Sequence, residues 1–88
     1  MRRYAVEIYW PGMTTALVEE LVGRAMVVAA DTSGEVVILD CSMAPRDETC
    51  SVRVLALDNA AVHRFMARLG LDGARATELV EVGSAAAK

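Results

Sequence analysis

One short stretch, residues 4–10, most constrains how this chain can fold. β-Branched and aromatic residues dominate it, and Pro11 and Gly12 follow directly, as is typical of a strand that ends in a turn. Side chains alternate between the two faces of a strand, so Tyr4 and every second residue after it form one apolar face. The opposite face carries an ionisable side chain at its middle, Glu7. We therefore predict a sheet with helices on one face and a second face left for a partner or a ligand.

The rest of the chain alternates between helical and extended patterns. One apolar helical stripe runs from a cap at Thr14 or Thr15 to about residue 30, and another follows the cap Asp58 over residues 59–69. Residues 35–43, 49–56 and 76–82 are predicted strands, and Gly70 suits the left-handed end of the second helix. The order β-α-β-β-α-β is that of the ferredoxin-like α+β fold. It predicts a four-stranded antiparallel sheet in the order 4-1-3-2, with two helices on one face.

The second predicted strand leaves its register open. Residues 36–39 are apolar on both faces, so we expect this strand to be covered on both sides. A shift by one residue would exchange the faces, so either Asp40 and Ser42, or Cys41 and Met43, face the open side. Residues 1–83 are predicted to form one domain, and residues 84–88 a flexible tail.

Composition narrows the classes of function. The chain has 88 residues, of which 55% are hydrophobic and 24% charged, and we expect this apolar excess to be buried in a homodimer. The net charge of -3 and the scattered arginines argue against nucleic-acid binding. No apolar run approaches the ~20 residues of a membrane span, and the first residues do not resemble a signal peptide. We therefore expect a cytoplasmic protein with reduced thiols and no membrane partner.

Several short motifs resemble those of a known group. They are Thr49 and Cys50, the helix entry at 56–61, the Leu-Gly-Leu exit at 69–71 and the closing segment 78–82. On these motifs the chain resembles a family of small bacterial ferredoxin-like proteins, mostly of unknown function, that includes a nickel-binding protein of actinomycetes. The resemblance implies a homodimer packed sheet to sheet, and it suggests metal binding. Family members commonly carry histidine where this chain has Phe65, and often proline where it has Asp72.

Ionisable and aromatic side chains on or near the predicted open face are the candidate site residues. The candidate catalytic residues are Glu7, Asp40 and His63, and the candidate substrate-binding residues are Tyr9, Trp10, Ser51, Arg53 and Leu55. Glu7, Arg53 and Asp40 are expected to form a row of alternating charge, which serves either acid/base chemistry or a structural salt bridge. Trp10 is either a stacking platform at the mouth of a cavity or part of the core or interface.

Metal chemistry has little support in the sequence. His63 is the only histidine, and a lone imidazole on a helix is commonly solvated, so we predict no metal ligands, no cofactor and weak nickel binding at best. Cys41 and Cys50 are predicted to be small buried apolar residues. No phosphate loop, dinucleotide fingerprint or nucleophile elbow occurs.

Three functions are compatible with this pattern. The favoured one is a small cofactor-independent enzyme of specialised, natural-product metabolism, catalysing a cyclisation or condensation by general acid/base chemistry in a cavity on the open sheet face. The first alternative is a dimeric protein that binds nickel or another divalent metal. The second is a non-catalytic dimer that binds a small molecule or has a structural role. A ligand-sized void between two sheets would favour the enzyme, whereas a fully packed interface would favour the structural dimer.

Overall fold

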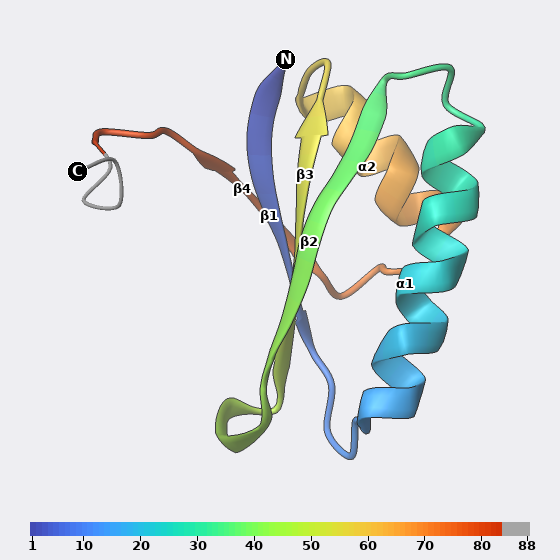
Figure 1. Ribbon diagram of the computed structural model, residues 1–88, viewed down its shortest axis with the longest axis vertical. Helices are drawn as coiled ribbons and strands as arrows, with labels where there is room; N and C mark the ends of the chain where they lie inside the picture. Colours follow the sequence, from blue (N-terminus) through green and yellow to red (C-terminus); the bar gives the residue numbers. More distant parts are fainter. Residues whose placement is uncertain (84–88) are drawn as a thin grey trace.

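The computed structural model describes residues 1–83, and the predicted tail at 84–88 lies outside the described residues. The elements are β1 (Arg2–Tyr9), α1 (Thr15–Ala30), β2 (Val36–Ala44), a 3₁₀ turn (Pro45–Asp47), β3 (Thr49–Ala56), α2 (Asn59–Arg68) and β4 (Arg75–Leu79). The strands form one antiparallel sheet in the order β2-β3-β1-β4, and both helices lie on the same side of it (Figure 1). The predicted ferredoxin-like α+β fold, with β1 and β3 at the centre, is confirmed.

The core lies between the sheet and the two helices, as the alternation along β1 predicts. Tyr4 and Val6 point to this side and are buried, whereas Glu7 and Tyr9 point to the other side and are exposed. The largest fully buried side chains are Tyr4, Phe65, Leu21, Val6, Val36, Val54, Val62 and Cys50. Burial of each large apolar side chain of this kind contributes about 1.5–3 kcal/mol, so this layer supplies most of the driving force for folding.

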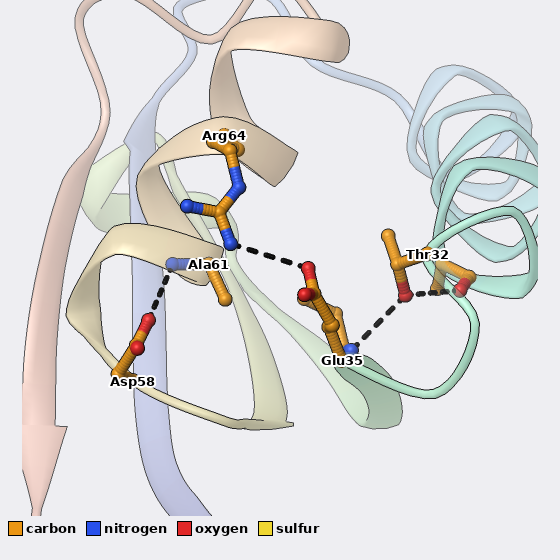
Figure 2. A network of polar contacts seen from close by, with 7 residues as sticks. Thr32, Glu35, Asp58, Ala61 and Arg64 are labelled. Atoms are coloured by element: carbon orange, nitrogen blue, oxygen red, sulfur yellow. Dashed lines mark hydrogen bonds and ion pairs between the residues drawn. The ribbon is translucent and has the colours of Figure 1, made fainter.

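The ends of α2 are defined by local hydrogen bonds. The carboxylate of Asp58 accepts a hydrogen bond from the Ala61 N–H at 2.9 Å, which satisfies a backbone donor in the first turn (Figure 2). At the other end, Gly70 has a φ of 71°, and the Leu71 N–H donates to the Met66 carbonyl at 3.0 Å. This is a Schellman ending, which needs a left-handed residue and therefore favours glycine. Both ends agree with the sequence-based prediction.

Polar contacts join the end of α1, the start of β2 and α2 (Figure 2). The Thr32 hydroxyl donates to the Ala29 carbonyl at 2.6 Å and accepts from the Val36 N–H at 3.1 Å. The guanidinium of Arg64 on α2 lies 3.2 Å from the Glu35 carboxylate. These contacts position the first residues of β2 beneath both helices.

Two predicted features of the strands are corrected. β4 runs only from Arg75 to Leu79, because Leu79 pairs with Arg3 and β1 begins at Arg2, so residues 81 and 82 have no strand opposite them. The segment after β4 leads away from the sheet (Figure 1). β2 is an edge strand covered by the helices on one side only, and Val37 and Leu39 remain 43% and 42% exposed. The expectation that β2 is covered on both sides is therefore wrong for the single chain.

The hydroxyl of Tyr4 is buried without a hydrogen-bond partner within residues 1–83. A buried polar group that lacks a partner costs about 1–3 kcal/mol, so we expect Tyr4→Phe to raise the free energy of unfolding by an amount in that range. Urea denaturation of both proteins measures the change. Tyr9→Phe is the matched control, because the Tyr9 side chain is 67% exposed and its hydroxyl can bond to water. A Tyr4→Phe variant that is no more stable than the wild type would contradict this prediction.

Candidate functional site

The side of the sheet that faces away from the helices is uncovered, and we call it the open face (Figure 1). Pairing between the strands aligns its side chains in rows that cross the sheet. We call the two central ones the polar rows: Asp40–Arg53–Ala5–Thr77 and Ser42–Ser51–Glu7–Arg75. A third row, Val37–Leu55–Arg3–Leu79, is largely apolar, and together with Leu39 and Val80 it forms what we call the apolar end of the open face.

A bulge in β2 determines which of its residues reach the open face. The pairing of β2 with β3 skips one position between Ile38 and Asp40, so the alternation of faces reverses there. Asp40 and Ser42 consequently join the open face, while Cys41 turns toward the helices. The register that the sequence left open is thereby resolved.

Asp40 and Arg53 form an ion pair on the open face. The Arg53 Nε donates to Asp40 Oδ1 at 2.7 Å, and Arg53 Nη2 donates to Oδ2, so the contact is bidentate. The hydrogen bond from Arg53 lowers the pKa of the Asp40 carboxyl below its ordinary value of 3.8, against a smaller opposing effect of burial. Both side chains are about half exposed in the single chain, so solvent screens much of this attraction.

The direction of the Asp40 shift predicts how stability depends on pH. Because the pKa is lower in the folded state, the pair contributes stability above the unfolded pKa and loses that contribution as the pH falls through the folded pKa. We expect the wild type to lose more free energy of unfolding than Asp40→Asn between about pH 5 and about pH 2. Urea denaturation at several pH values measures this. An Asp72→Asn control should behave as the wild type, and equal acid sensitivity of wild type and Asp40→Asn would contradict the prediction.

Glu7 lies in the other polar row, and this corrects the predicted arrangement. Its direct neighbours across the sheet are Ser51 on β3 and Arg75 on β4, not Arg53, which pairs with Asp40. The Glu7 side chain is exposed in the single chain, and no ion pair to its carboxylate occurs within residues 1–83. Glu7 is thus a carboxylate at the middle of the sheet that the fold of one chain does not use.

A small cavity adjoins the polar rows at the apolar end. It has a volume of about 200 Å³ and is lined by Arg3, Leu39, Arg53, Leu79, Val80 and Glu81. Two arginine side chains thus line this hollow together with three apolar side chains and the carboxylate of Glu81. Such a hollow can hold a small molecule that carries a negative group.

The remaining candidate residues divide between the two sides of the sheet. Tyr9 belongs to the open face opposite Thr49, and Leu55 lies at the apolar end. Trp10 packs against the core on the helix side, where it lines a cleft of about 380 Å³ together with residues of α1 and of the segment that follows α2. His63 is exposed on α2, with its Nδ1 2.9 Å from the Asn59 carbonyl oxygen. The sheet therefore separates Trp10 and His63 from Glu7 and Asp40, and they cannot share one site within a chain.

Two arginines near the site were not singled out from the sequence. Arg75 lies directly opposite Glu7, but the last strand was expected to begin one residue later. Arg3 lines the open-face cavity. Alternation along β1 places Arg3 on the same face as Glu7, so the sequence did contain a signal for its position.

Comparisons with known proteins give no relative. The chain matches no family model, no curated protein and no solved structure. Within residues 1–83, no group of three or more His, Cys, Asp and Glu side chains is placed to hold a metal ion. No helix in the same part of the chain is long and apolar enough to cross a bilayer. The function is therefore inferred from the open face itself.

Proposed function

We propose that this protein is a homodimeric enzyme of small-molecule metabolism, in which two open faces pack together and enclose the polar rows. Glu7 is the general acid/base of this site. The observation that carries the proposal is the carboxylate of Glu7 at the centre of the open face, with a hydroxyl on one side, a guanidinium on the other and no ion-pair partner within residues 1–83. An unpaired carboxylate contributes little to folding and is costly to bury, so its presence on a face that the dimer covers favours a catalytic role.

The apolar end supports the dimer. Its side chains come from all four strands and from the segment after β4, and Val37, Leu39, Leu79 and Val80 are all exposed in the single chain. A contiguous apolar patch on a small protein commonly marks an interface. Association of two open faces covers this patch and removes water from the adjoining polar rows.

The reaction class follows from the groups in one polar row. Glu7 removes a proton from a carbon next to a substrate carbonyl, and the negative charge moves to the carbonyl oxygen. The Ser51 hydroxyl and the Arg75 guanidinium stabilise that oxygen. The carbon then attacks a second carbonyl, in the same molecule for a cyclisation or in another for a condensation, and protonated Glu7 delivers its proton to the new alkoxide. The step needs proton transfer and positioning alone.

The cavity beside Arg3 and Arg53 suggests how a substrate is held. A carboxylate or another anionic group on the substrate would bind Arg3, because Arg53 is already paired with Asp40, while an apolar or aromatic portion contacts Leu39 and Leu79. We therefore propose a small anionic carbonyl compound as the substrate class.

The experiment that tests the proposal needs no knowledge of the natural substrate. Nitrobenzisoxazole opens to a coloured phenolate when a base removes a single C–H proton, and the reaction accelerates when a carboxylate acts in a water-poor site. We expect the wild-type protein to open this compound at least about 10²-fold faster than an equal concentration of acetate, the lower range for a positioned base. A rate equal to that of acetate would contradict the proposal.

A further inference from the structure

Sulfur-bearing side chains gather on the helix side of the sheet, away from the open face. The Sγ atoms of Cys41 and Cys50 lie 3.5 Å apart, and Met43 is directly opposite Cys50 in the pairing of β2 with β3. The bulge in β2 produces this arrangement, because it turns Cys41 and Met43 toward the helices. Cys50 is only 1% exposed, while Cys41 and Met43 are half-buried against the core.

A cleft gives solvent access to this cluster. It lies between α1 and β2, has a volume of about 430 Å³ and is lined by Thr15, Val18, Glu19, Val22, Cys41, Ser42 and Met43. A small ion in the cleft would meet Cys41 and Met43 first, and Cys50 lies next to Cys41. The cleft walls that α1 contributes are partly apolar, which suits a soft cation better than a strongly hydrated one.

We propose that this cluster is a site for one Cu(I) ion, bound by the thiolates of Cys41 and Cys50 and by the thioether of Met43. Thiolate and thioether sulfurs are the ligands that select Cu(I). With metal–sulfur bonds of about 2.3 Å and the angles of about 120° of a three-coordinate ion, two sulfurs lie about 4.0 Å apart. The observed Sγ–Sγ distance of 3.5 Å is about half an ångström shorter, so a small side-chain movement lets both thiolates bind one ion.

Other metals fit the ligand set less well. Structural zinc sites have four protein ligands drawn from cysteine, histidine and carboxylates. Within residues 1–83, such side chains do not converge even in a group of three. Cu(I) accepts two or three sulfur ligands, which is what Cys41, Cys50 and Met43 supply.

A disulfide fits the same geometry less well. Cys41 pairs with Val52 and Cys50 with Met43, so the two cysteines are diagonal neighbours on adjacent strands. The Cα atoms of such neighbours lie about 7–8 Å apart. Disulfides favour Cα separations of about 4.4–6.8 Å. Binding of Cu(I) breaks two S–H bonds, forms two Cu–thiolate bonds and one Cu–thioether bond, and releases two protons to water, with no change in oxidation state.

An anaerobic Cu(I) titration in competition with the coloured chelator bicinchoninate tests the site. We expect the wild type to withdraw one Cu(I) per chain, and Cys41→Ala and Cys50→Ala to lose this stoichiometric binding. Met43→Leu should weaken binding at least on the order of tenfold, because loss of a ligand should cost no less than loss of a group that merely supports one. Met26→Leu is the matched control and should bind as the wild type, because Met26 is exposed on α1 and does not line the cleft.

Several outcomes would overturn the site. They are a wild type that withdraws no copper, a folded Cys41→Ala variant that still binds one equivalent, and equal weakening by Met26→Leu and Met43→Leu. Peroxide treatment that links Cys41 to Cys50 in a wild type unable to bind copper would instead assign the pair to redox chemistry. Because the cluster and Glu7 lie on opposite sides of the sheet, Glu7→Gln should leave copper binding unchanged. The result is therefore independent of the function proposed for the open face.

Discussion

The Glu7→Gln variant is expected to fold and dimerise as the wild type does, and to open nitrobenzisoxazole about 10²- to 10⁴-fold more slowly. Glutamine keeps the shape and the hydrogen-bonding reach of glutamate, but its amide cannot accept a proton at neutral pH. The fold of one chain uses no ion pair to Glu7 within residues 1–83, so the substitution should cost little stability. The loss is expected in the rate of the chemical step, measured from the absorbance of the product.

Glu20→Gln provides the matched control for this loss. Glu20 is an exposed carboxylate on α1, on the far side of the sheet, so the same chemical change there should leave the rate unaltered. A fully active Glu7→Gln variant would remove Glu7 from the proposed mechanism and leave Asp40 as the next carboxylate on the open face. A variant that keeps its rate but dimerises weakly would assign Glu7 to the interface, and would also contradict the catalytic role.

The second large effect is expected from a charge placed in the apolar end. Leu55→Glu puts a carboxylate between Val37 and Arg3 in the row that the proposed dimer buries. Arg3 lies beside the new carboxylate, but removing both charged groups from water still costs on the order of 3–5 kcal/mol, which corresponds to a Kd for dimerisation raised by roughly 10²- to 10⁴-fold. Sedimentation velocity over a range of concentrations should show this variant as a monomer where the wild type is a dimer.

Val27→Glu separates this interface from other surfaces. Val27 is also exposed and apolar, but it lies on α1, so the same substitution there should leave the dimer intact. Dissociation of the Val27→Glu variant, with Leu55→Glu still dimeric, would place the interface on the helix side and overturn the proposed packing.

The layers of the fold could be predicted because local signals and burial agree. The alternation from Tyr4 onward separates a core face from an open face, and it needs no knowledge of the other strands. Asp58 and Gly70 mark the ends of α2 through contacts made within a few residues. Signals of this kind are complete within a short window of sequence.

Which residues form the site depends on pairing between strands that are far apart in the sequence. No short window of sequence specifies this pairing. Residues 36–39 are apolar on both faces, so their pattern does not indicate the bulge that sends Asp40 to the open face and Cys41 to the other. Arg75 joins the row of Glu7 only because β4 pairs with β1 in one particular register. The separation of His63 and Trp10 from Glu7 likewise follows from which layer each element occupies.

The most direct test of a site shared between two open faces compares rate and mass at the same protein concentrations. The rate of nitrobenzisoxazole opening per chain and the mass from light scattering should fall together on dilution, from a dimer of twice 9.4 kDa to an inactive monomer of 9.4 kDa. The Leu55→Glu variant should show the monomeric mass and the low rate throughout. A 9.4 kDa species at micromolar concentration that retains the full rate would contradict the shared site, as would a stable dimer with no rate above that of acetate.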